Sequence, residues 1–415
     1  MGAHAGLAVR AVAALALVAA GLAGCTAATS GQAAGPPAGT RAAGTRAGGP
    51  ASGTSETPPV TVYVIADSAV VAIRAATGVS SRKIPAGAVP YAIAVTPDGK
   101  TAYAIDGYDN FHGNVTPINT ATLTAGPLIS AGDRLTGIAI TPDGRTAYVL
   151  SGETGEVIPI STATGRPGAP INAGGAGAFP TAVAITPDGK TVYVPVSTVR
   201  GYEVVTPIDT AASTVGQPIR IGPADGGGCA TDAIAITPNG KTAYVTNYSD
   251  GTVTPISTAT NTAGPPIKTG QGPSYIAITP DGQTAYVSNQ GSGTVTPIQV
   301  ATNTPGPPIR IGKPINPVES GCATEVTAIS PDGKTAYVTS YNGGTVIPIS
   351  TVTNTAGRAI KTGKNPSYIA ITPDGKTAYA SNKGSGTVTP IDTATNTPGT
   401  PIPVGPDPGP IAIAP

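Results

Sequence analysis

Few residues in this sequence could carry out acid–base or nucleophilic chemistry. His112 is the only histidine beyond residue 25, and no nucleophile-elbow motif accompanies it, so a Ser-His-Asp triad is not expected. Carboxylates that could form an acid–base pair or hold Ca²⁺ precede repeated segments at Asp225, Asp232, Glu319 and Glu325. Such residues more often cap backbone N–H groups or face solvent. We therefore predict no catalytic residue and no metal site.

The sequence also lacks the motifs of common cofactors. It has no Cys-x-x-Cys-His segment for haem attachment, and it has no tryptophan, which excludes the tryptophan repeats of quinoprotein dehydrogenases. Charged residues make up 11% of the chain and the net charge is +1, so no broad electrostatic field would attract nucleic acid. We expect no cofactor and no nucleic-acid partner.

The three cysteines have different expected fates. An apolar stretch from Ala11 to Gly24, too short for a comfortable membrane span, ends in Leu-Ala-Gly-Cys, which resembles the lipobox of bacterial lipoproteins. Residues 1–24 are then a lipoprotein signal peptide and Cys25 is lipidated; an ordinary signal peptide with a chance cysteine is the alternative. Cys229 and Cys322 lie in near-copies 93 residues apart, and both a disulfide and two inherited free thiols remain open for them.

Residues 25–58 differ in composition from the rest of the chain. They are almost entirely Ala, Gly, Ser, Thr and Pro, and cannot bury enough apolar surface to offset the entropy lost on ordering. We predict a disordered tether there and a single folded domain over residues 59–415.

The folded part is built from a repeat. Pro-Asp-Gly recurs at steps of 42 to 51 residues from Pro97 to Pro373, with Pro238-Asn239-Gly240 as a variant. This period, with several short strands in each unit, is typical of a β-propeller. In the unit that starts at Tyr368, YIAIT, TAYAS, TVTPI and TPIPVG read as four strands separated by turns. We call them strands A to D, from the centre of the ring outward.

The two ends of the chain predict how the ring closes. Residues 60–87 read as strands B, C and D without an A, and residues 409–415 read as an A alone. Their pairing would complete one blade and remove the free edges. We predict an all-β protein, a β-propeller of eight four-stranded blades; seven blades would result if the divergent first unit were something else.

Strand C contains a proline in nearly every copy, for example Pro255 and Pro297. Proline cannot donate to a ladder and is rare in a fully paired strand. We expect strand D to be short, so that the proline nitrogen faces a gap or a bulge.

The repeat resembles a known family. Tyr244 to Asn247 spell YVTN, and the surrounding AIAITPNGKTAYVTNYSDGTVTPI is similar to the YVTN-repeat β-propellers of surface-layer and exported prokaryotic proteins. The likeness covers about residues 60–415 and departs at the end of strand C, where Thr-Pro-Ile often replaces Val-Ile-Asp. The resemblance implies a propeller fold and an extracytoplasmic setting, but it transfers no catalytic site.

Alternating strand directions divide the disc into two faces. The A–B and C–D turns share one face, here called the turn face, and their sequences are nearly uniform. The B–C loops and D–A connections share the other, here called the loop face, where sequences vary and binding roles are usually acquired. Unconstrained drift of loops is the alternative explanation. The candidate binding residues on the loop face are Tyr91, Tyr108, Phe111, His112, Arg134, Phe179, Arg200, Tyr202, Asp232, Tyr275, Glu325 and Tyr368.

These features predict a non-enzymatic binding or scaffold protein. We expect it to be extracytoplasmic, lipid-anchored to the bacterial cell membrane and monomeric, with a cell-surface protein or a cell-wall glycan as its partner. One alternative is a lactonase-like hydrolase with a carboxylate site at the channel mouth, an analogy that rests on fold alone. A purely structural surface-layer component is another.

Overall fold

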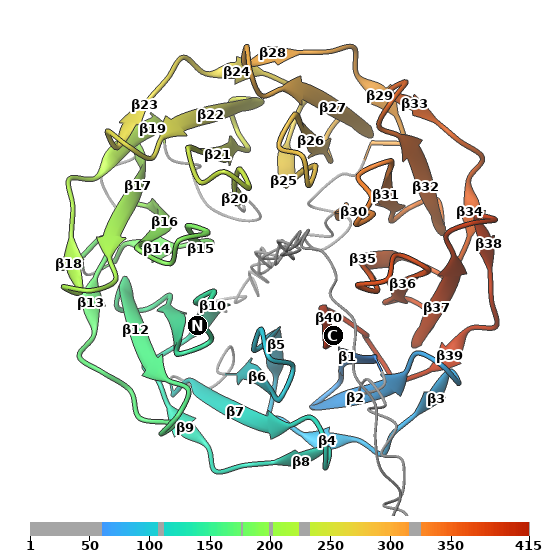
Figure 1. Cartoon of the computed structure of the whole chain (residues 1–415), viewed down its shortest axis with the longest axis horizontal. Coiled ribbons are helices and arrows are strands. Elements are labelled where there is room, and N and C mark those ends of the chain that lie inside the picture. The colour runs from blue at the N-terminus through green and yellow to red at the C-terminus, as the bar shows by residue number, and fades with distance from the viewer. Residues whose placement is uncertain are drawn as a thin grey trace, which may run out of the picture.

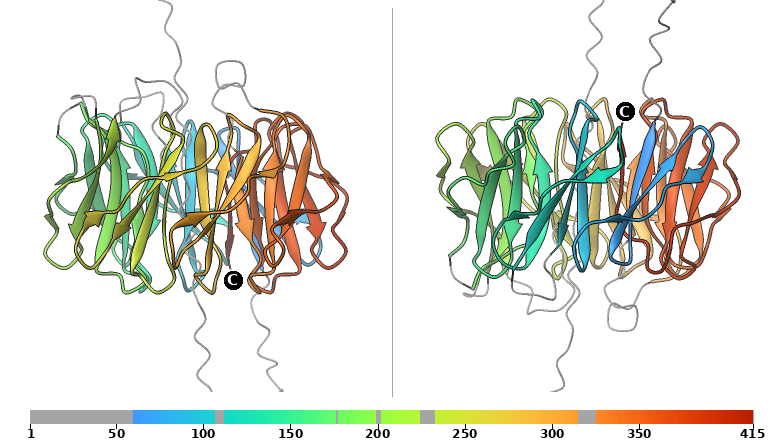
Figure 2. Two further views of the ribbon diagram at one scale, coloured as in Figure 1. Left: turned by 90° about the horizontal axis from the view of Figure 1, so that it is seen from above. Right: turned by 90° about the horizontal axis from the view of Figure 1, so that it is seen from below.

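A computed structural model describes residues 60–106, 112–175, 177–198, 202–223, 233–314 and 325–414. Eight small antiparallel sheets surround a central axis and form a disc (Figures 1 and 2). The predicted all-β propeller is therefore confirmed, with eight blades rather than seven. Within the described ranges there is no helix with the length and apolar character needed to cross a membrane.

The first four blades have these strands. Blade 1 contains β40 (Ile411–Ala414), β1 (Thr61–Ala66), β2 (Ala69–Arg74), β3 (Val79–Ser80) and β4 (Ile84–Pro85). Blade 2 contains β5 (Pro90–Val95), β6 (Thr101–Asp106), β7 (Asn114–Asn119), β8 (Thr124–Ala125) and β9 (Ile129–Ser130). Blade 3 contains β10 (Leu135–Ile140), β11 (Thr146–Ser151), β12 (Glu156–Ser161) and β13 (Ile171–Asn172). Blade 4 contains β14 (Phe179–Pro180), β15 (Ala184–Ile185), β16 (Thr191–Ser197), β17 (Tyr202–Asp209), β18 (Thr214–Val215) and β19 (Ile219–Pro223).

The remaining four blades repeat the same plan. Blade 5 contains β20 (Ile234–Ile236), β21 (Thr242–Asn247), β22 (Thr252–Ser257), β23 (Thr262–Ala263) and β24 (Ile267–Lys268). Blade 6 contains β25 (Pro273–Ile278), β26 (Thr284–Asn289), β27 (Thr294–Gln299), β28 (Thr304–Pro305) and β29 (Ile309–Arg310). Blade 7 contains β30 (Thr327–Ile329), β31 (Thr335–Ser340), β32 (Thr345–Ser350), β33 (Thr355–Ala356) and β34 (Ile360–Lys361). Blade 8 contains β35 (Pro366–Ile371), β36 (Thr377–Asn382), β37 (Thr387–Asp392), β38 (Thr397–Pro398) and β39 (Ile402–Pro403).

The ring closes as the chain ends predicted. Strand β40 from the C-terminus pairs with β1 from the N-terminus, in register from Thr61 opposite Ala414 to Val64 opposite Ile411. The blue and red ends of the chain meet in this one blade (Figure 1). Because β40 pairs with β1, the inner edge of β1 is not left open.

The proline in strand C has the predicted explanation. In blade 6, strand D is split into β28 and β29, which pair with the two ends of β27. The middle of β27 therefore has no ladder partner on its outer edge. The carbonyl of Pro297 accepts a hydrogen bond from Gly306 N at 2.8 Å. Since the nitrogen and carbonyl of a strand residue point to the same edge, the proline nitrogen faces this gap and no ladder donor is lost.

The core consists of eight hydrophobic clusters, one between each pair of neighbouring blades. The third residue of every strand B is a tyrosine, and each one is buried in these clusters. Tyr379 of the last blade donates to the carbonyl of Ala75 in the first, at 3.4 Å. Seven such hydroxyls reach a backbone carbonyl in the C–D turn of the next blade, those of Tyr63, Tyr103, Tyr193, Tyr244, Tyr286, Tyr337 and Tyr379.

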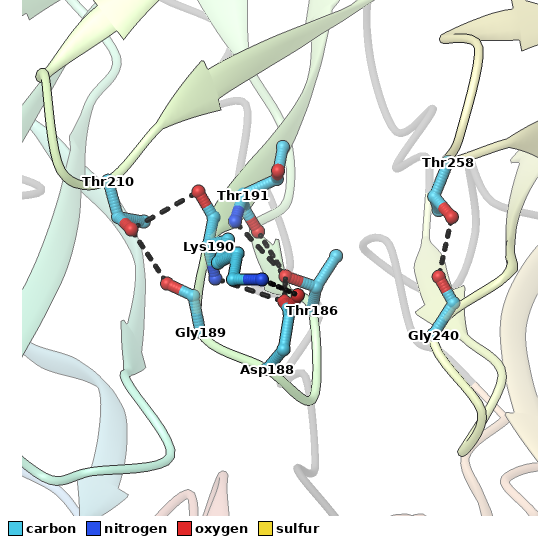
Figure 3. A network of polar contacts seen from close by, with 8 residues as sticks. All are labelled: Thr186, Asp188, Gly189, Lys190, Thr191, Thr210, Gly240 and Thr258. Carbon is cyan, nitrogen blue, oxygen red and sulfur yellow. Dashed lines mark hydrogen bonds and ion pairs between the residues drawn. The ribbon is translucent and has the colours of Figure 1, made fainter.

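Polar groups of the turn face are used in the fold itself (Figure 3). In blade 4, the Thr186 hydroxyl and the backbone N–H of Lys190 both donate to Asp188 Oδ1, at 2.6 and 3.1 Å. These two hydrogen bonds, the hydroxyl first, lower the pKa of Asp188. Thr210 in the C–D turn donates to the carbonyl of Gly189 at 2.7 Å, so the two turns of a blade are joined. The polar groups of the turn face therefore stabilise the turns of the repeat.

Candidate functional site

The structure describes some of the predicted loop-face residues and not others. Tyr202 lies in β17, where only its backbone is described. Residues outside the described ranges are Tyr108, Phe111, Arg200 and Asp232 of the candidate binding face, together with Cys25, Cys229 and Cys322. The lipidation and disulfide predictions therefore remain predictions.

A rigid turn carries Asp133 and Arg134 between blades 2 and 3. The hydroxyl of Ser151 donates to the carbonyl of Asp133 at 2.6 Å and accepts from its N–H at 3.3 Å. Gly152 N donates to the carbonyl of Arg134 at 2.8 Å. Arg134 has a left-handed backbone with φ of 49°, an uncommon conformation that these bonds hold in place. The turn thus presents both side chains from a fixed position.

Two interactions connect this turn to neighbouring loops. His112, before β7, places its Nδ1 3.3 Å from Asp133 Oδ1, and its side chain is 90% exposed. The Arg134 guanidinium lies over the ring of Phe179, in β14, at 5.2 Å from its centroid, a cation–π contact. We call His112, Asp133, Arg134 and Phe179 the His112–Phe179 cluster. It joins three of the predicted site residues across blades 2 to 4.

The sequence did not reveal that Asp133 belongs to this cluster. Asp133 and His112 are 21 residues apart, in two different connections, and no motif links them. Only the return of strand D to the loop face beside the B–C loop of the same blade brings the two side chains together.

The three candidate tyrosines of the inner strands are largely packing residues. Tyr91 is half-buried against the cluster between blades 2 and 3. Tyr275 is 9% exposed and packs with Tyr368 in the cluster that also holds Val326. Burial raises the pKa of Tyr275 to about 12, and raises that of Tyr368 further with a smaller contribution from Tyr275 beside it. Their hydroxyls therefore remain protonated at neutral pH.

Glu325 is the unusual carboxyl group of the inner ring. It stands six residues before the proline of its A–B turn, the position held by Thr136, Ser274 and Ser367 in blades 3, 6 and 8. At this position, the inner strands of blades 3, 6 and 8 each have a β-bulge. Glu325 is 0% exposed, neither of its carboxyl oxygens has a hydrogen-bond partner among the residues that the structure describes, and burial raises its pKa well above the ordinary value. The group is thus held in its protonated form over an extended pH range.

The described loop-face residues bring several kinds of polar and aromatic group together. The His112–Phe179 cluster offers guanidinium and imidazole donors, a carboxylate acceptor and an aromatic face, which together suit carboxylates and sugar rings. Among the described residues, no group of three or more His, Cys, Asp and Glu side chains could hold a metal ion.

Comparisons with known proteins reveal the fold alone. No family model matches the chain, and no curated protein matches it in sequence. Dihydro-haem d1 dehydrogenase NirN, solved in complex with DHE, has a TM-score of 0.68 at 16% identity, over 85% of this chain and 74% of that one. Apo AztD from Citrobacter koseri has a TM-score of 0.60 at 12% identity, over 86% and 97% of the chains. Hydrazine synthase of Kuenenia stuttgartiensis has a TM-score of 0.56 at 22% identity, over 84% and 99%. The chain shares its architecture with these proteins.

Proposed function

We propose that this protein is an exported, membrane-tethered binding protein that recognises its partner through the loop face. The partner is a cell-wall glycan or a cell-surface protein. The observation that carries the proposal is the contrast between the two faces. The turn-face groups bond within the repeat, as Thr186 and Asp188 do, whereas the His112–Phe179 cluster recurs in no other blade among the described residues and presents charged and aromatic groups outward. The predicted lipidation at Cys25 and the likeness of the repeat to YVTN-repeat propellers support export.

Co-sedimentation of the purified domain with cell-wall sacculi tests the proposal. Arg134→Ala removes the stacked guanidinium, and Arg145→Ala is the matched control because Arg145 is an exposed arginine on the turn face of the adjoining blade. We expect R134A to reduce sedimentation about tenfold, since a bidentate carboxylate contact is worth about 1.5 kcal/mol or more. R145A should sediment like the wild type. Equal loss in both variants would contradict a loop-face site.

A second candidate function rests on Glu325. A buried carboxyl group with a raised pKa at the inner ring could serve as a general acid in a lactonase-like hydrolase. Turnover of sugar lactones by the wild type, lost in Glu325→Gln while the melting temperature is kept, would favour this function. Absence of both lactone turnover and glycan or protein binding would instead favour a purely structural surface-layer component.

A further inference from the structure

Exposed cations occupy one outer position on consecutive blades. Lys268, Arg310 and Lys361 are the last residues of β24, β29 and β34, the second halves of strand D in blades 5, 6 and 7. These three strands follow one another along the outer edge of the ring (Figure 1). Neutral residues hold the same position in blades 8, 1, 2 and 3, namely Pro403, Pro85, Ser130 and Asn172, and blade 4 has Arg220 there, in the longer strand β19. We call Lys268, Arg310 and Lys361 the basic belt.

The basic belt differs from the cations of the turn face. Apart from Lys241, which follows Asn239, the cations of the A–B turns have an aspartate two residues away, as in Lys190 with Asp188 at 3.5 Å and Lys376 with Asp374 at 3.4 Å. Within the part of the chain that the structure describes, no ion pair involves a belt residue. The belt cations therefore keep their full charge for an external anion.

Two further exposed cations flank β34 of blade 7. Arg358 precedes β34 and Lys364 follows it, and both side chains are exposed. Described carboxyl groups in the same half of blades 5 to 8 are Asp250, Asp407 and the buried Glu325; Asp225, Asp232 and Glu319 lie outside the described ranges. Cations thus outnumber the described exposed carboxylates along this part of the rim.

The belt lies in the loop-face half of the disc. Lys268 pairs with Thr252 and Arg310 with Thr294, the residues with which strand C begins after its B–C loop. The chain enters the propeller at Thr61, where β1 starts as a strand B, and strand B begins at the turn face. The chain therefore enters the propeller on the turn-face side, and the belt lies in the opposite half of the disc.

We propose that the basic belt binds a phosphodiester-linked polymer of the cell surface. This inference rests on the proposed tethered function and adds a partner to it. Single exposed cations hold small anions weakly, whereas several at regular intervals match a chain with repeated charges and gain from multivalent contact and counterion release. The placement in the half of the disc opposite the chain's entry favours such a polymer over the lipid surface that would carry the proposed anchor.

Binding to poly(glycerol phosphate) tests the proposal in the intact domain. The test variant is the triple K268Q/R310Q/K361Q, and the control is K100Q/K190Q/K376Q, which removes three positive charges from the turn face instead. Raising salt from about 50 to about 200 mM should weaken wild-type binding roughly 20- to 40-fold for three contacts. The belt variant should lose most of this salt dependence and of the low-salt affinity, whereas the control should behave like the wild type.

Three results would overturn the proposal. They are equal losses in both triple variants, equal binding to uncharged dextran, and tighter binding to phosphatidylglycerol vesicles than to the polymer. Retained polymer binding by R134A, together with retained sacculus binding by the belt variant, would separate this surface from the His112–Phe179 cluster. Failure of one site then leaves the other tested independently.

Discussion

The inner-ring position of Glu325 holds different residues in different blades, although the repeat is otherwise nearly uniform. In blade 3 this position is held by Thr136, whose hydroxyl donates to the carbonyl of Pro180 in blade 4, at 3.0 Å. A carboxyl group at the same position has no such partner and must stay protonated to avoid a buried charge. The sequence identified the position, because it precedes every A–B turn, but the burial of Glu325 depends on the neighbouring blades.

The folding stability of the wild type should therefore decrease as pH rises through the folded pKa of Glu325. Because this pKa is raised, the stability is fully present below the unfolded-chain pKa of about 4.3 and is lost toward higher pH. Glu325→Thr, which copies Thr136, should remove this loss. The free-energy difference between E325T and wild type, from urea unfolding at several pH values, should increase with pH.

The free-energy difference between E325T and wild type separates the effect of Glu325 from that of other titrating groups. Aspartates of the turn face, such as Asp188, have lowered pKa values and affect both proteins equally in the acid range. A difference between E325T and wild type that stays constant with pH would show that Glu325 is not held protonated by the fold.

At the scale of elements, the links between blades follow a rule with informative exceptions. In blades 5 to 8 an asparagine in the C–D turn, with φ near 54°, accepts from the tyrosine of the preceding blade, as Asn354 Oδ1 does from Tyr286 at 2.6 Å. Blade 1 has Gly78 at this place, with φ of 66°, and Tyr379 bonds only to the carbonyl of Ala75. A cavity of about 290 Å³ lies beside Gly78 and Tyr379.

Gly78→Asn should therefore stabilise the junction at which the ring closes. An added Cβ would meet only Ile402, at 3.7 Å, and asparagine tolerates this backbone conformation. A new acceptor for the Tyr379 hydroxyl should add about 1 kcal/mol to the free energy of unfolding, measured by urea denaturation. Gly78→Ala is the control, because it lacks the acceptor; equal stabilisation by both variants would assign the effect to unfolded-chain entropy.

The strands themselves could be predicted from the sequence, whereas their exact contacts could not. Alternation and turn residues predicted strands A to D, and Pro297 predicted a short strand D with a gap or a bulge opposite the proline. The division of strand D into β28 and β29 was not predicted. The pairing of Tyr286 with Asn354 had a signal in the tyrosine of each repeat and the asparagine that recurs in blades 5 to 8. No sequence signal predicted the close approach of Gly270 to Asn289. A Cβ added at Gly270 would lie 2.7 Å from Asn289 Cβ.

For the whole molecule, stability depends on closure of the ring by four residues from the C-terminus. Deletion of residues 410–415 removes β40, whose Ile411 is 2% exposed in the cluster between blades 8 and 1, and leaves β1 without a partner. We expect a loss of about 3 kcal/mol or more and a broader unfolding transition. A peptide with the sequence of residues 409–415 should restore part of the stability in trans. An unchanged transition would contradict closure by β40.

The architecture of the whole molecule was the most predictable level, since the repeat period and the incomplete units at the two ends determine eight closed blades. The arrangement of the His112–Phe179 cluster was the least, because its members come from three separate connections. Sequence variation located the face that carries it, but only the folded ring brings Arg134 over Phe179.

In the proposed function, the loop face, and not the turn face, makes the contact with a partner. A photo-crosslinking amino acid placed at position 112, whose side chain is 90% exposed on the loop face, tests it most directly in intact cells. Position 188, an exposed turn-face residue, is the matched site. We predict cross-linked glycan or protein adducts from position 112 and none from position 188. Adducts of equal yield from both positions, or from position 188 alone, would contradict the account.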